Sequence, residues 1–64
     1  MIKALLDNNR IKISETVKQT EKATLFRIHA YKKEYLQFWI PKTAYSFVDK
    51  DIIEYKNWFK PKFN

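Results

Sequence analysis

The stretch that decides the fold is ATLFRIHAYKKEYLQFWI, residues 23–40. Apolar side chains recur at every second position in both halves of this stretch, which the polar sequence KKE separates at residues 32–34. A period of two is the spacing of a β-strand with one buried face. The sequence therefore predicts two strands joined as a hairpin, with an apolar face made by Phe26, Ile28, Ala30, Leu36, Phe38 and Ile40.

The pairing of these two strands depends on the length of the loop between them. A three-residue loop at residues 32–34 places Tyr31 opposite Tyr35. On the apolar face the expected pairs are then Ala30 with Leu36, Ile28 with Phe38, and Phe26 with Ile40. On the other face they are His29 with Gln37 and Arg27 with Trp39. A one-residue shift would mix the two faces, so burial should enforce this parity.

Two further strands are expected before the hairpin. The sequence DNNR, residues 7–10, can form a two-residue turn at Asn8 and Asn9, because the chain has no glycine and asparagine tolerates a positive φ. The turn would pair Leu6 with Ile11 and Ala4 with Ile13. Together with Ile2, these four residues would form one apolar face. Residues 11–20, IKISETVKQT, are β-branched and alternating and favour one strand. A turn near Glu21 and Lys22 would bring Val17 near Phe26.

The C-terminal third, residues 43–64, must cover the apolar face of such a sheet. Pro41 ends the preceding strand or confines it to an edge, and Thr43 is expected to cap a helical turn. Residues 49–59, DKDIIEYKNWF, favour a short helix with Asp51 in a capping box, although IIEY is equally good strand material. We expect some of the following side chains to lie over the sheet: Tyr45, Phe47, Ile52, Trp58 and Phe59.

These expectations describe a single mainly-β domain over residues 1–64. We expect a small, twisted antiparallel sheet of about four strands in a meander, which could curl toward a barrel. A short C-terminal helical or extended segment closes it. At 64 residues without cysteine, stability must come from apolar burial, and an edge strand could also support a homodimer.

Charge and composition limit the classes of partner. The net charge is +6, and eleven lysines stand against two arginines. This balance suits unspecific attraction to phosphate or to an acidic protein groove, although it also serves solubility. No segment is long and apolar enough to span a membrane, and MIKALLDNNR, residues 1–10, lacks the features of a signal peptide. We therefore expect a cytoplasmic protein, in the host cytoplasm if a phage encodes it.

The polar face of the central hairpin is the first candidate site. It combines aromatic rings with cations and comprises Arg27, His29, Tyr31, Tyr35 and Trp39, with Lys32 and Lys33 at the tip. Aromatic rings that stack on bases beside cations that bind phosphates are typical of a single-stranded nucleic-acid platform. Two alternatives stay open. Cross-strand pairs could merely stabilise an exposed face, with Arg27 stacked on Trp39, or the face could bind a protein.

The second candidate is YKNWFKPKF, residues 55–63, which has three lysines, four aromatic residues and no acid. It could be a basic arm that lays aromatic groups and charge on a partner. Because Trp58 and Phe59 are strongly apolar, we expect both to be packed, with Lys60 and Lys62 exposed.

Nothing in the sequence indicates catalysis, a cofactor or a metal site. His29 is the only histidine, and a surface role fits it better than that of a general base. The acids Asp49, Asp51 and Glu54 lack the rhythm and the glycine of a calcium loop, and helix capping explains Asp51 better. We therefore expect a protein that is not an enzyme.

Three short motifs resemble those of a loose set of small bacterial and phage-encoded proteins. The matching positions over residues 20–60 are Glu21, Lys22, Ala23, Trp39, Ile40, Pro41, Lys42, Thr43 and Trp58. Thr43 stands where serine is usual, and the intervening loop is longer. The resemblance implies a mobile-element origin and a small β fold, with Trp39 packed beside the turn that Thr43 caps.

The leading hypothesis is a small non-enzymatic protein that binds nucleic acid through a basic aromatic surface. Its partner would be single-stranded nucleic acid or a host nucleoprotein complex. The alternative is a phage-type inhibitor that binds a host nucleic-acid-handling complex by protein–protein contact, for example an anti-CRISPR protein. The candidate binding residues are Arg27, His29, Tyr31, Lys32, Lys33, Tyr35, Trp39, Lys60 and Lys62.

Overall fold

Residues 4–62 fold into β-strands with a single short helical turn. The computed structural model describes residues 4–62. In chain order the elements are β1 (Leu5–Leu6), β2 (Arg10–Lys12), β3 (Glu15–Gln19), β4 (Ala23–Tyr31), β5 (Glu34–Pro41), the 3₁₀ turn η1 (Lys42–Ala44), β6 (Tyr45–Asp49) and β7 (Ile52–Tyr55). The mainly-β antiparallel fold is confirmed, and no helix in this part of the chain is long and apolar enough to cross a membrane.

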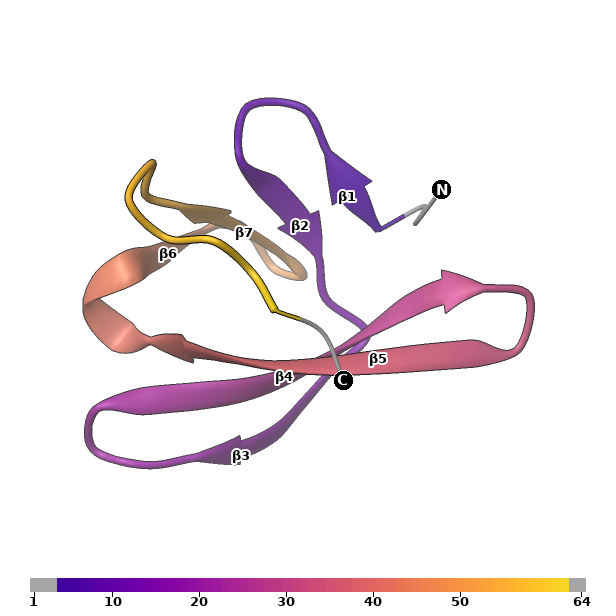
Figure 1. The fold of residues 1–64 in the computed structure, drawn as a ribbon, viewed down its shortest axis with the longest axis horizontal. Coiled ribbons are helices and arrows are strands. Elements are labelled where there is room, and N and C mark those ends of the chain that lie inside the picture. Colours follow the sequence, from indigo (N-terminus) through magenta and orange to yellow (C-terminus); the bar gives the residue numbers. More distant parts are fainter. Residues whose placement is uncertain (1–3, 63–64) are drawn as a thin grey trace.

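The strands form two sheets, where we had expected a single meander of about four strands. One sheet has the order β1-β2-β7-β6 and the other the order β3-β4-β5, and all pairings are antiparallel (Figure 1). The expected strand at residues 11–20 is divided between them. The amide of Ile13 donates to Asp51 in the first sheet, whereas that of Ser14 donates to Arg27 in the second. Both sheets are open over residues 4–62, so they do not close into a barrel.

The long β4–β5 hairpin has the expected faces but not the expected pairs. Its turn contains two residues, Lys32 and Lys33, with Tyr31 opposite Glu34, and a bulge at Ala30 shifts the register beyond it. The apolar face pairs Ile28 with Leu36, Phe26 with Phe38 and Thr24 with Ile40. The other face pairs His29 with Tyr35, Arg27 with Gln37 and Leu25 with Trp39. The register moved by two residues, which preserves parity and keeps the same side chains buried.

The turn at Asn8 and Asn9 is confirmed, but its length is not. Both residues have positive φ, 63° and 60°, and Asp7 also belongs to the turn. Leu5 therefore faces Ile11 and Leu6 faces Arg10, so the expected pairs of Leu6 and Ala4 are wrong. The expected position of Ile2 lies outside the described residues.

The turn between β3 and β4 lies where it was expected. Thr20 closes it, because its amide donates to the carbonyl of Ala23 at 2.9 Å. Thr16, not Val17, stands opposite Phe26, and Val17 lies exposed in a bulge.

The C-terminal third covers the hairpin with a second sheet. Residues 52–55, for which a helix was favoured, form β7, because Ile53 is paired with Ile11 on one side and with Phe47 on the other. The helical turn after Pro41 is present, but no side chain caps it, so the capping role of Thr43 is wrong.

The core lies between the two sheets. The first sheet and the residues that flank β1 and β2 contribute Ala4, Ile11, Ile13 and Ile53, the second contributes Phe26, Ile28, Phe38 and Ile40, and η1 adds Ala44. Phe26 is fully buried, and its ring lies 5.2 Å from that of Tyr45 and 6.1 Å from that of Phe47. These two rings of β6 therefore cover the hairpin, as was expected of them.

Candidate nucleic-acid interface

The outward face of the hairpin carries the first group of candidate residues, but their contacts differ from those expected. Arg27 Nη1 lies 2.6 Å from Glu15 Oε1, and Gln37 is the residue across the strand. Arg27 is therefore held by an acid of β3, and the expected cross-strand pair of Arg27 with Trp39 is wrong, because Trp39 stands opposite Leu25. The glutamate offsets much of its charge, which makes Arg27 a weaker candidate for a phosphate ligand than a free lysine.

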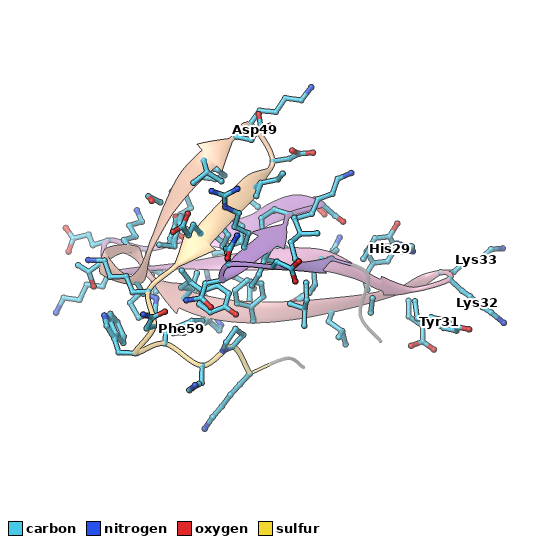
Figure 2. The ribbon with its side chains drawn as sticks, turned by 90° about the horizontal axis from the view of Figure 1, so that it is seen from above. His29, Tyr31, Lys32, Lys33, Asp49 and Phe59 are labelled. Carbon is cyan, nitrogen blue, oxygen red and sulfur yellow. The ribbon has the colours of Figure 1, made fainter. Side chains whose placement is uncertain are left out.

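The tip of the hairpin gathers a second part of the candidate set. Tyr31 and Tyr35 are 52% and 55% exposed. The ammonium of Lys32 lies 5.6 Å from the centre of the Tyr31 ring, and the ring of His29 lies 5.3 Å from that of Tyr35. His29 Nε2 is hydrogen-bonded to the carbonyl oxygen of Lys32. Figure 2 shows Tyr31 and the two lysines projecting together at one end of the molecule, with Lys33 directed into solvent.

Trp39 is separated from this tip and lies with the C-terminal tail. Trp39, Phe59, Lys60 and Lys62 line one groove of about 480 Å³. Trp39 is 44% exposed, and both lysines are exposed, as predicted. The two candidate regions of the sequence, the hairpin face and the basic tail, therefore meet at Trp39. We call this groove the Trp39 groove.

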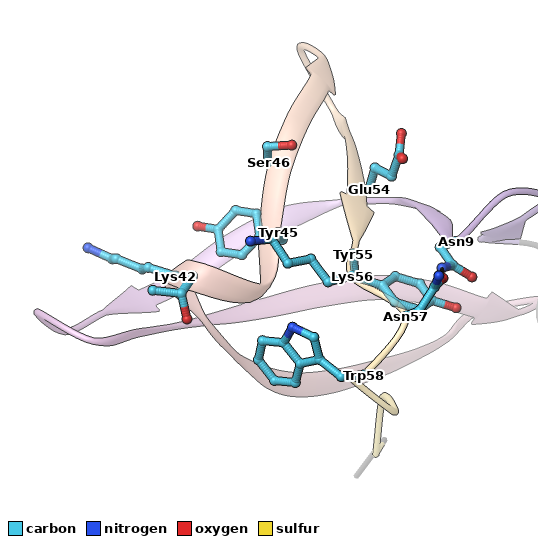
Figure 3. Close-up of a pocket in the computed structure, with 10 residues that line it drawn as sticks. Asn9, Lys42, Tyr45, Ser46, Glu54, Tyr55, Lys56, Asn57 and Trp58 are labelled. Carbon is cyan, nitrogen blue, oxygen red and sulfur yellow. Dashed lines mark hydrogen bonds between the residues drawn. The ribbon is translucent and has the colours of Figure 1, made fainter.

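A second groove, of about 770 Å³, lies on the other side of Phe59 along the tail, and we call it the Trp58 groove. Its aromatic and charged lining residues are Lys42, Tyr45, Glu54, Tyr55, Lys56 and Trp58. Figure 3 shows the indole of Trp58 lying below the side chains of Lys56 and Tyr45. Trp58 is 61% exposed, so the prediction that it packs into the fold is wrong. Phe59 packs instead, against Tyr55 and the core.

The lysines of the Trp58 groove come from distant parts of the chain. The amide of Lys42 donates to the carbonyl of Lys22 at 2.9 Å, and that of Lys56 donates to the carbonyl of Ala44 at 2.8 Å. Sequence reasoning named neither Lys42 nor Lys56 as a binding residue. Lys56 and Trp58 both lie in the basic tail and could have been chosen from it. Lys42 had no such signal, because only the junction of β5 with η1 brings it to the groove.

The positive charge of both grooves is not neutralised by internal ion pairs. Within residues 4–62, the two ion pairs join Arg27 to Glu15 and Arg10 to Glu54, and neither involves a lysine. Glu54 lines the Trp58 groove, but its carboxylate is shared with Arg10, whose Nε lies 3.4 Å away. The lysines are therefore available to an anionic partner.

A cluster of side chains that could bind a metal ion is not assembled in the described part of the chain. No three of its histidine, aspartate and glutamate side chains are placed to hold a metal ion. Ser14, His29 and Asp51 line one further groove of about 540 Å³. His29 Nε2 is hydrogen-bonded to the backbone carbonyl of Lys32.

Comparison of the chain with protein-family models, curated proteins and solved structures finds no match. The resemblance to small bacterial and phage-encoded proteins therefore stays a prediction.

Proposed function

We propose that this protein binds single-stranded nucleic acid, without catalysing a reaction, through the Trp39 groove and the outward face of the β4–β5 hairpin. The observation that carries the proposal is that Trp39, Lys60 and Lys62 line one groove although about twenty residues separate them in the sequence. An exposed indole in a groove with two lysines that make no ion pair within residues 4–62 offers a surface for a base and two contacts for phosphates.

The chemistry of this surface favours unpaired bases. Stacking of a base on an aromatic side chain contributes about 1–3 kcal/mol and tolerates any sequence, because every base has a π-face. Lysine attracts phosphate as a point charge and does not read base edges in the fixed geometry of arginine. The expected binding is therefore strong at low salt and weakly selective for sequence.

The hairpin tip provides a second contact on the same face. Tyr35 and Trp39 share the outward side of β5, about 13 Å apart at the usual rise per residue. Tyr31 and Tyr35 can stack on further bases, and Lys32 and Lys33 can contact the phosphates between them. Lys32 and Lys33 at the hairpin tip and Lys60 and Lys62 at the Trp39 groove would then contact the phosphates of one strand.

The test is a titration of fluorescently labelled oligo-dT and oligo-rU with the full chain, followed by anisotropy at several salt concentrations. Each phosphate contact on a single strand contributes about 0.7 to the slope of log K against log salt, so four lysines predict a magnitude of at least about 2.8. The variant W39A should bind about 5- to 150-fold more weakly. The variant K50A, in the turn between β6 and β7, should bind like the unmodified protein.

Absence of binding to either oligonucleotide at low salt would overturn the proposal. In that case the alternative, a protein that docks on a host nucleic-acid-handling complex, would be examined by affinity capture with and without nuclease. A captured protein that remains bound after nuclease treatment and at moderate salt would support that alternative.

A further inference from the structure

We infer that a bound single strand does not end at the Trp39 groove but continues along the tail into the Trp58 groove. Trp58 stacks on a further base there, and Lys42 and Lys56 contact its phosphates. This inference rests on the proposed function and adds a binding region that lies outside the hairpin.

The first argument is the continuity of the surface. Phe59 lines the Trp39 groove, and its ring lies 6.4 Å from that of Trp58, which lines the next groove. The two rings are perpendicular, with an angle of 89° between their planes. Phe59 packs toward the core, whereas Trp58 is exposed to solvent. The tail therefore separates two neighbouring aromatic sites.

The second argument is that Trp58 is exposed on a segment that is held in place. The amide of Phe59 donates to the carbonyl of Lys56 at 3.0 Å, and the side-chain amide of Asn9 donates to Asn57. The turn that carries Trp58 is therefore tied to the β1–β2 hairpin on one side and to η1 through Lys56 on the other. An indole that is held on the surface is available for stacking at little cost in conformational entropy.

The third argument is the charge of the Trp58 groove. Its two lysines make no ion pair within residues 4–62, and Arg10 shares the only acid that lines the groove. The backbone carbonyl of Lys22 accepts a hydrogen bond from the amide of Lys42, which holds Lys42 in place beside the groove. Together with Lys60 and Lys62, these residues extend the positive surface along the tail.

These features favour a single strand over a duplex. Trp39 and Trp58 can each stack only on a base that is free of its partner, whereas a duplex offers phosphates but encloses the faces of its bases. A strand that occupies both grooves engages two indoles, so affinity should rise with oligonucleotide length until both grooves are filled.

The deciding experiment compares the double variant K42A/K56A and the single variant W58A with the unmodified chain. The double variant should reduce the magnitude of the salt slope by about 1.4, because two phosphate contacts are lost. W58A should weaken binding of a long oligonucleotide by about 5- to 150-fold and of a dinucleotide much less. The matched control is K50A. Figure 2 places Asp49, the neighbour of Lys50, away from Phe59.

A fluorescence measurement gives a second readout that does not depend on truncating Trp58. The chain has two tryptophans, so W39F leaves Trp58 as the only one. Quenching of its emission by oligo-dT would support the inference. Emission that stays constant while anisotropy shows binding would overturn it.

The outcomes separate this inference from the proposed function. If the unmodified chain binds but both the double variant and W58A keep its affinity and salt slope, the strand does not enter the Trp58 groove and the proposed function still stands. If the unmodified chain binds neither oligonucleotide, both fail. Circular dichroism of each variant establishes that it is folded; if W58A is not, W58L takes its place.

Discussion

One hydrogen bond connects the two sheets through their core, and it provides a sharp test of the packing. Thr24 on β4 is 1% exposed, and its Oγ1 lies 2.9 Å from Oη of Tyr45 on β6. Tyr45 is half-buried, so its hydroxyl group can still reach water if the bond is lost. Removal of the Tyr45 hydroxyl group and removal of the Thr24 hydroxyl group should therefore lower the free energy of unfolding by different amounts.

The magnitudes follow from that difference in burial. Y45F leaves the Thr24 hydroxyl buried without its partner, which costs about 1–3 kcal/mol. T24V removes the buried hydroxyl group and leaves only the Tyr45 hydroxyl to be solvated, so about 0.5–1.5 kcal/mol is expected. In the double variant no buried polar group is left unpaired, so its loss of stability should be smaller than the sum of the two single losses by about 1 kcal/mol.

The assay is thermal and urea unfolding followed by circular dichroism. The unfolding entropy of a domain of this length is such that a loss of 1 kcal/mol in the free energy of unfolding lowers Tm by about 7 °C. Y45F should therefore lower Tm by about 7–20 °C, and adding T24V should recover part of that loss. Strictly additive losses, or a Y45F variant as stable as the unmodified chain, would refute the link between the sheets.

Three further changes test the core, the outward face and the tip. F26A should lower the free energy of unfolding by about 3–5 kcal/mol, which is comparable with the entire stability of so small a domain. Its circular dichroism at 25 °C should therefore be that of a largely unfolded chain. A folded spectrum would contradict the packing of this ring against the second sheet. Y31A and Y35A should each change the free energy of unfolding by less than about 0.5 kcal/mol, because both rings are exposed, and a large fall in Tm would place them in the core instead. K32G should raise the free energy of unfolding by up to about 1 kcal/mol, because φ at Lys32 is 54° and glycine adopts this region without strain. A fall in Tm on this change would count against that conformation of the tip.

The C-terminal tail shows which features of the site local sequence can predict and which it cannot. Lys60 and Lys62 were expected to be exposed because unpaired charged side chains are rarely buried. Trp58 was expected to pack because it is strongly apolar. Only one of two adjacent rings could enter the core beside Tyr55, and Phe59 occupies that place. Such a choice depends on the shape of the surface below the tail.

The buried side chains of the hairpin could be predicted from local sequence, because alternation is a property of neighbouring residues and a register shift of two does not alter it. Phe26, Phe38 and Ile40 are fully buried, as their parity requires. The change of sheets between Ile13 and Ser14, and the strand that contains Ile53, depend instead on contacts between distant segments. The residues that impose both features belong to other segments of the chain. Ile13 and Ser14 donate to the carbonyls of Asp51 and Arg27, and Ile53 stands opposite Ile11 and Phe47 in the two neighbouring strands. The meeting of Lys42, Lys56 and Trp58 in one groove has the same origin.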